Sequence, residues 1–277
     1  MKALKYFVLL ALIIILPNKS RAVFLDDERK LELKCKIQSR ASFRTSDSRG
    51  FTAPRVSAGT LVQHRNLAYL EVNHSLSPHL KYHLVGRFLY EGIYDYGPGK
   101  YRKVRNSSKN DIDDFKKDVD LWEGYLDYDR GPLFVRVGRQ NISWGETDMF
   151  QLLDRINPLD NTWGGIFEDL DDRRIPLWML RSTYNLGDLR QIQSAALEFF
   201  INPDFADQEV SPVTPYGTPY AFPAPQSALK TRRVYPGNDS KGSRYGLRLQ
   251  GVIANNFNFS LAHYRTILIE ARGQVYY

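Results

Sequence analysis

Apolar and polar residues alternate with a period of two along much of the chain. Between Leu80 and Tyr90, leucine, tyrosine and phenylalanine fall on one face of an extended chain, while Arg87 and Glu91 fall on the other. This pattern is typical of β-strands with two unlike faces. A tilted transmembrane strand needs about 9–11 residues, so a strand over this segment is long enough to cross a bilayer.

Further segments show the same alternation. It is clean in residues 122–128, 178–186, 195–201 and 245–253, and less regular in residues 31–39, 60–72, 133–140 and 257–269. Apolar residues at helical spacing do not persist over a long stretch. We therefore predict an all-β protein with about eight to ten antiparallel strands, or more.

The connections between these segments are of two kinds. Residues 129–132 and 255–256 have the composition of short turns, whereas residues 95–118 and 203–236 are long and polar, and the latter contain seven of the 14 prolines. Short turns at one end of a sheet and long loops at the other are typical of an outer-membrane β-barrel. A secreted β-sandwich with insertions would have similar connections.

Aromatic residues lie near both ends of several apolar faces. The pairs are Tyr82 and Tyr90, Trp178 and Tyr184, and Trp122 and Tyr128. A membrane barrel places aromatic girdles at these positions, although rings in a sandwich core would follow the same pattern. In the segment 122–128 we expect Trp122, Leu126 and Tyr128 to share the apolar face, opposite Glu123 and Asp127.

Residues 1–22 have the features of a secretory signal peptide: basic residues, an apolar stretch, and a small-residue cleavage site. An uncleaved anchor is the alternative. Their removal leaves 34 basic and 31 acidic residues in residues 23–277, so the charge does not point to a nucleic-acid partner. Cys35 is the single cysteine, and we expect a plain strand residue there.

Residues 138–140, 143–146 and 156–160 carry the most distinctive motifs, Gly-Arg-Gln, Ser-Trp-Gly-Glu and Ile-Asn-Pro-Leu-Asp. With the preceding hairpin at residues 123–127, they resemble the bacterial outer-membrane proteins grouped as family of unknown function 1302. The match is strong over residues 117–187. The resemblance implies a porin-like barrel in the bacterial outer membrane, inserted by the barrel-assembly machinery, that passes small, hydrophobic or steroid-like solutes, often beside an RND-type transporter. It supplies no catalytic residue.

Members of that family are usually longer than this chain. The resemblance therefore implies that residues 23–277 are either a small barrel or a barrel domain truncated at the C-terminus. Alternation in residues 269–277 resembles the terminal signal read by barrel-insertion machinery, although chance explains that match as well.

The polar partners of the alternating segments would line a lumen. These candidates are Arg87, Glu91, Glu123, Asp127, Arg136, Arg181 and Arg248. Opposed charges across a narrow pore orient dipolar solutes, and the arginine excess predicts a preference for anions. Alternatively, the charges pair with one another and fill a small barrel.

Residues 139–160 are our candidate for a constriction or an inward-folded loop. They contribute Arg139, Gln140, Trp144, Glu146, Asn157 and Asp160. Backbone without strand structure is tolerated at membrane depth only inside protein or facing water. We predict that a strand ends near Trp144, with a helical turn at 149–153 and a turn at Asn157; Trp144 could instead anchor the strand at the membrane interface.

The chemistry we expect is binding or passage, not catalysis. The sequence contains no Gly-x-Ser-x-Gly nucleophile elbow, no phosphate-binding loop, no dinucleotide-binding fingerprint and no Cys/His cluster with zinc spacing. We therefore predict neither a cofactor nor a metal. The second hypothesis is a secreted or periplasmic β-sandwich that binds a ligand or carbohydrate. The third is a carboxylate hydrolase using residues such as Glu146 and Asp160. We interpret residues 169–174, which mix both charges, as a solvated or ion-paired loop.

Overall fold

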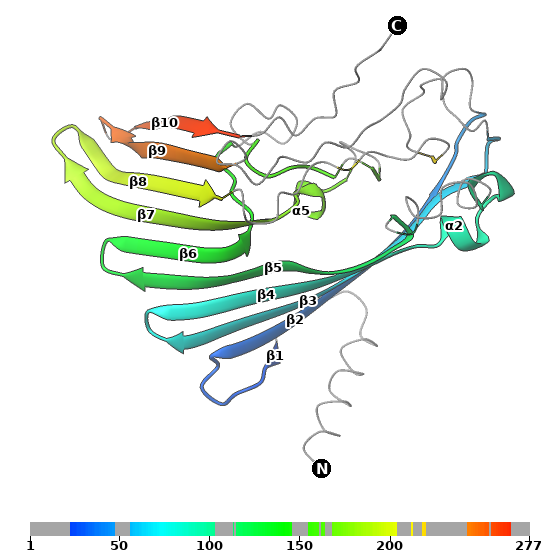
Figure 1. The fold of residues 1–277 in the computed structure, drawn as a ribbon, viewed down its shortest axis with the longest axis horizontal. Helices are drawn as coiled ribbons and strands as arrows, with labels where there is room; N and C mark the ends of the chain where they lie inside the picture. Colours follow the sequence, from blue (N-terminus) through cyan, green and yellow to red (C-terminus); the bar gives the residue numbers. More distant parts are fainter. Residues whose placement is uncertain are drawn as a thin grey trace, which may run out of the picture.

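The computed structural model describes residues 23–47, 56–102, 113, 115–145, 155–160, 162–163, 168–203, 212, 218–219, 243–254 and 256–266. In these residues the chain forms ten antiparallel strands in one sheet, together with the short helices α2 (Ile93–Tyr96) and α5 (Leu170–Arg173) (Figure 1). The predicted all-β fold is therefore confirmed. The predicted signal peptide and the alternation at 269–277 lie outside the described residues.

Each strand pairs with its neighbours in sequence, in the order β1 to β10. Their bounds are β1 (Val23–Phe24), β2 (Leu31–Phe43), β3 (Leu61–Ser77), β4 (Leu80–Glu91), β5 (Lys117–Arg130), β6 (Leu133–Gln140), β7 (Leu177–Leu189), β8 (Ile192–Asn202), β9 (Arg244–Ile253) and β10 (Phe257–Arg265). Every segment predicted from alternation contains one of these strands. Within the described residues β1 pairs only with β2 and β10 only with β9, so the sheet is not closed into a barrel there.

One strand end differs from the prediction. β6 ends at Gln140 and not near Trp144. The backbone N–H of Ile142 donates to the side-chain Oδ1 of Asn157 at 3.0 Å. The Ile142 N–H group is therefore bonded to Asn157, outside the sheet, and is not available to extend the pairing of β6 with a neighbouring strand.

The two ends of the sheet have different connections. β3 and β4, β5 and β6, and β7 and β8 are joined by turns of two residues, whereas residues 44–60, 92–116, 141–176 and 203–243 make long connections. Figure 1 shows the short turns at one end of the sheet and the helices α2 and α5, which belong to two of the long connections, toward the other. The asymmetry predicted from composition is therefore confirmed.

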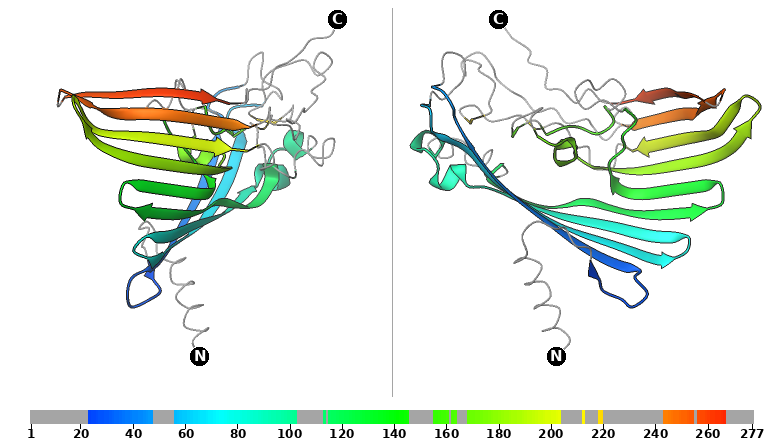
Figure 2. Two further views of the ribbon diagram at one scale, coloured as in Figure 1. Left: turned by 60° about the vertical axis from the view of Figure 1, so that its left-hand side comes forward. Right: turned by 180° about the vertical axis from the view of Figure 1, so that it is seen from behind.

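The apolar face of the sheet is exposed and its charged face is buried. Leu84, Leu197 and Leu247 are 40%, 37% and 47% exposed on one face, which we call the outer face. On the opposite, inner face Glu91 is 0% exposed and Glu198 is 1% exposed. The sheet is twisted and curved (Figure 2), and the inner face is the one covered by α5. A soluble sheet normally buries its apolar face.

Trp122 lies on the inner face, so the prediction that it shares the apolar face with Leu126 and Tyr128 is wrong. The pairing of β4 with β5 skips Trp122, because Val85 lies opposite Glu123 and Gly86 lies opposite Leu121. This β-bulge adds one residue to β5 and shifts the alternation that precedes it. Trp122 is consequently 5% exposed, while Leu126 and Tyr128 remain 42% and 37% exposed.

Apolar packing is concentrated in two clusters near the long connections. The first contains Leu67, Leu89, Ile93, Tyr94, Tyr101 and Trp163. The second contains Ile142, Trp144, Ile156, Leu177, Met179 and Phe200. Both combine strand residues with residues of the connections, so these clusters fix the connections against the sheet. No helix in the described ranges is long and apolar enough to cross a membrane.

Candidate functional site

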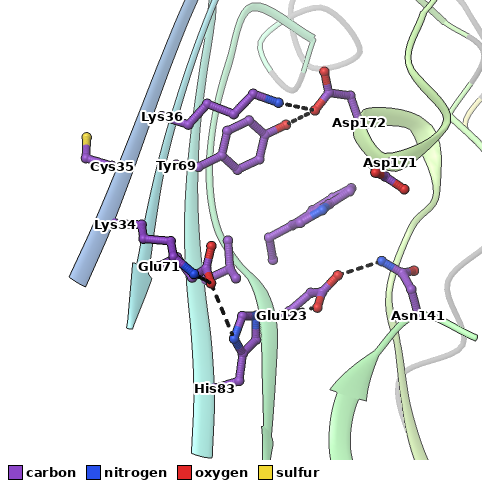
Figure 3. A pocket seen from close by; sticks show the side chains of 12 residues that line it. Lys34, Cys35, Lys36, Tyr69, Glu71, His83, Glu123, Asn141, Asp171 and Asp172 are labelled. Carbon is purple, nitrogen blue, oxygen red and sulfur yellow. Dashed lines mark hydrogen bonds and ion pairs between the residues drawn. The ribbon is translucent and has the colours of Figure 1, made fainter. Parts of the chain in front are cut away.

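A cavity of about 480 Å³ lies on the inner face over β2 to β5 (Figure 3). We call it the inner-face cavity. Its lining combines charged, polar and aromatic side chains: Lys34, Cys35, Lys36, Tyr69, Glu71, His83, Val85, Trp122, Glu123, Asn141, Asp171 and Asp172. The volume falls in the range of small-molecule sites.

A hydrogen-bonded row crosses β2, β3 and β4 along one side of the cavity. Lys34 Nζ lies 3.3 Å from Glu71 Oε1 and 3.0 Å from Glu32 Oε2. Asn73 Nδ2 donates to the same Glu71 oxygen at 2.6 Å, and Asn73 Oδ1 lies 2.5 Å from His83 Nδ1. Period-two geometry explains the row, because inner-face residues of paired strands lie side by side.

The opposite side of the cavity is built by β5 and the residue after β6. Asn141 Nδ2 donates to Glu123 Oε1 at 2.8 Å, and His83 Nε2 lies 3.7 Å from Glu123 Oε2. Trp122 reaches this side through the bulge, and the Arg87 guanidinium lies 3.4 Å from the centre of its ring. A cation at this distance interacts favourably with the face of an indole.

Helix α5 covers the cavity. The Tyr69 hydroxyl donates to Asp172 Oδ1 at 2.8 Å, and Lys36 Nζ lies 3.8 Å from the same oxygen. Figure 3 shows Asp171 extending toward the cavity and Cys35 pointing away from it. Cys35 is a free cysteine in β2, as expected.

Residues 155–160 and 168–175 form a segment that contacts both the β2–β3 side and the β9 side of the inner face. Arg65 Nη1 lies 3.5 Å from Glu168 Oε2, and Arg40 forms an ion pair with the same carboxylate. On the other side, Arg244 Nη1 donates to the Ile156 carbonyl at 3.5 Å. Burial lowers the pKa of Arg173 in this segment, while Asp160 and Glu168 act in the opposite direction.

Asn157 joins three parts of this region and is 1% exposed. Its Oδ1 accepts from Ile142 N, and its Nδ2 donates to the carbonyls of Gln140 at 3.3 Å and Ile175 at 2.9 Å. An asparagine suits this position because one amide group both donates and accepts.

The predicted lumen residues lie on the inner face, and most are ion-paired. Arg87 Nη2 lies 2.8 Å from Asp118 Oδ2, and Arg136 Nε lies 2.6 Å from Asp127 Oδ1. Further along the sheet, Glu198 joins two predicted arginines. Its Oε1 lies 2.6 Å from Arg181 Nε, and its Oε2 pairs with Arg248. This pairing corresponds to the alternative in which the charges neutralise one another; their role in a pore stays a prediction.

The remaining predicted residues are distributed over several environments. Glu91 accepts from the backbone N–H groups of His64 at 2.6 Å and Ile93 at 3.1 Å. Arg139 lies 2.9 Å from Asp120, and Gln140 Nε2 donates to the Met179 carbonyl at 2.9 Å. Trp144 packs in the second apolar cluster. Asp160 Oδ1 accepts from Thr162 N at 2.9 Å. Glu146 and the predicted helical turn at 149–153 lie outside the described residues.

Of the predicted site residues that the structure describes, Glu123 alone lines the inner-face cavity. Residues 169–174, predicted as a solvated or ion-paired loop, include helix α5 and bury Asp172 and Arg173, and Asp172 pairs with Lys36. Tyr69, Lys36 and Asp172 were not predicted to act together. The alternation in β2 and β3 places Lys36 and Tyr69 on the inner face, but the sequence holds no signal that brings α5 onto them.

No group of three or more His, Cys, Asp or Glu side chains is placed to hold a metal ion in the described part of the chain. Comparison with curated proteins and with solved structures finds no match. A family model matches residues 3–267, nearly the whole chain, and its description is "Protein of unknown function (DUF1302)". The chain belongs to this family.

Proposed function

We propose that this protein forms a porin-like β-barrel in the bacterial outer membrane and that small molecules bind in it or pass through it. The observation that carries the proposal is the burial of charged residues opposite an exposed apolar face. On β7, Trp178, Leu180 and Tyr184 are 42%, 37% and 48% exposed. Apolar residues facing out and polar residues facing in are the pattern of a transmembrane barrel.

The positions of the exposed aromatic residues also support a membrane location. Tyr128 and Tyr184 lie toward the short-turn end of the sheet, and Trp178 and Tyr245 lie toward the other end. Transmembrane barrels have aromatic girdles at both interfaces of the apolar band. Two such rows, one at each end of the outer face, fit that arrangement.

The inner face suits binding or restricted passage. It contains the inner-face cavity, and residues 155–160 and 168–175 contact the inner face on the β3 and the β9 sides. An inward-folded segment of this kind narrows a lumen, and non-strand backbone is tolerated where protein or water surrounds it. Export by a signal peptide, insertion by the barrel-assembly machinery and work beside an RND-type transporter belong to this proposal.

The β-sandwich alternative receives less support. The ten described strands form a single sheet, and the described residues include no second sheet covering the outer face. A sandwich in water would bury that apolar face against a partner sheet. The carboxylate-hydrolase alternative depends on Glu146, which lies outside the described residues, while Asp160 accepts a hydrogen bond from Thr162 N.

Fractionation of cells that express the full chain tests the proposal. We expect recovery from the outer membrane only with detergent, and slower or faster gel migration before boiling than after it. The detergent-purified protein should then make lipid vesicles permeable to small solutes, with vesicles lacking the protein as the control. Recovery as a water-soluble protein without a migration shift would contradict the proposal.

A further inference from the structure

We infer that the inner-face cavity binds a small organic cation, with a primary ammonium group attached to an apolar or aromatic body. The inference rests on the proposed function in treating this molecule as a solute of the barrel. Three features of the molecule support it: the cavity, the charges that line it and its aromatic rings.

The charge of the lining favours a cation. Two lysines and four carboxylates contribute: Lys34, Lys36, Glu71, Glu123, Asp171 and Asp172. Lys34 lies beside Glu71, and Lys36 lies nearest to Asp172. Both lysines are therefore occupied by carboxylates, and two negative charges remain in excess. In a recessed site, such an excess raises the local concentration of cations.

The lining contains one carboxylate without a partner, Asp171, and one unpaired carboxylate oxygen, on Asp172, among the described residues. Asp171 is exposed, and no hydrogen bond or ion pair connects it to another described residue. Asp172 is 4% exposed, and its Oδ2 atom has no hydrogen-bond partner there. A buried carboxylate oxygen is costly to leave unpaired. A primary ammonium group has three donors, so it is suited to bind the Asp171 carboxylate at the cavity.

The aromatic side chains of the cavity provide a second, independent argument. Trp122 and Tyr69 both line it, and each already has a protein cation over its ring. Arg87 lies 3.4 Å from the Trp122 ring centre, and Lys36 Nζ lies 5.4 Å from that of Tyr69. Because protein cations already lie over these rings, what the rings offer a ligand is apolar surface for its aromatic body.

Calorimetric titration of the detergent-solubilised full chain with benzylammonium tests the inference. Benzyl alcohol has a similar ring without charge, and benzoate has the opposite charge. We expect benzylammonium to bind at least about tenfold more tightly than benzyl alcohol, because the alcohol has no positive charge and only one hydrogen-bond donor. Benzoate should not bind measurably. Equal binding of the three probes, or tighter binding of benzoate, would overturn the inference.

Two variants locate the binding site. Asp171→Asn removes an exposed charge in the cavity, and Asp27→Asn makes the same change in the exposed turn between β1 and β2. Asp171→Asn should weaken benzylammonium binding about tenfold, while Asp27→Asn should leave it unchanged. Equal effects of the two variants would contradict the assignment. If the same preparation shows the boiling-dependent migration shift but does not bind benzylammonium, this inference fails while the proposed function stands.

Discussion

Neighbouring residues of β8 show how differently the two faces of the sheet are built. Glu198 on the inner face is 1% exposed, whereas Leu197 and Phe199 beside it on the outer face are each 37% exposed. Water favours the opposite arrangement, since burial of apolar surface stabilises a fold and burial of an unpaired charge destabilises it. Alternation in the sequence shows that the sheet has two different faces. The exposed fractions in the structure show that the apolar face is the outer one, which suits apolar surroundings.

Each face has its own source of stability. Inner-face charges are held by partners, as in the contacts of Glu198 with Arg181 and Arg248. Outer-face side chains form apolar cross-strand pairs, such as Phe199 with Leu247. Substitutions on the two faces should therefore change the stability of the detergent- or lipid-embedded protein in different ways.

The largest effect is expected for Glu198→Gln on the inner face. The substitution removes the charge shared by Arg181 and Arg248, and breaking a buried ion pair costs about 3–5 kcal/mol. Urea unfolding measured by the boiling-dependent gel shift gives the free energy of unfolding. Glu28→Gln is the matched control in an exposed turn and should cost less than about 1 kcal/mol. Similar values for both variants would contradict the ion-pair account of the inner face.

A smaller effect is expected for Leu247→Lys on the outer face. A lysine at the middle of a bilayer costs about 2–4 kcal/mol, whereas a lysine at a position already 47% exposed to water is nearly neutral. Gln250→Lys places the same residue on the inner face of β9. In lipid vesicles we expect the first variant to lose stability and the second to change little. A neutral Leu247→Lys variant would mean that water surrounds the outer face.

Asn157→Ala should have the smallest of the three effects. It leaves Ile142 N and the carbonyls of Gln140 and Ile175 without their side-chain partner, at a local cost of about 1–3 kcal/mol. Amide hydrogen exchange of Ile142 should accelerate, while the migration shift stays unchanged. Asn258→Ala, on an exposed position of β10, serves as the control. Unchanged exchange at Ile142 in the Asn157 variant would contradict the role of Asn157 in joining these segments.

The positions of the strands could be predicted because period-two alternation of apolar and polar residues is a local signal of a strand with two different faces. All predicted segments contain strands, and the positions of Arg87, Glu91, Arg136, Arg181 and Arg248 on the inner face follow from that period. The predicted phase of β5 is wrong at Trp122, where the strand contains a bulge. Its apolar residues change from odd positions, such as Val119 and Leu121, to even ones, such as Leu126. This phase change was the visible signal of the bulge.

The cavity was less predictable because it depends on contacts between segments far apart in sequence. Lys36, Tyr69 and Asp172 come from β2, β3 and α5, and Asp172 lies 103 residues from Tyr69. Local pattern places each side chain on a face but does not bring a connection onto that face. The end of β6 depended in the same way on Asn157, which competes for the Ile142 N–H group.

The lengths of the connections also set an order of folding. Every strand pairs with its neighbours in sequence, and two-residue turns join three of the pairs. Closing so short a loop loses little chain entropy, and hairpins form in about 1–10 μs. Residues 92–116, 141–176 and 203–243 separate the hairpins by much longer stretches of sequence. Hairpins should thus form first as local units, and their docking across the long connections should limit the rate at which the sheet assembles.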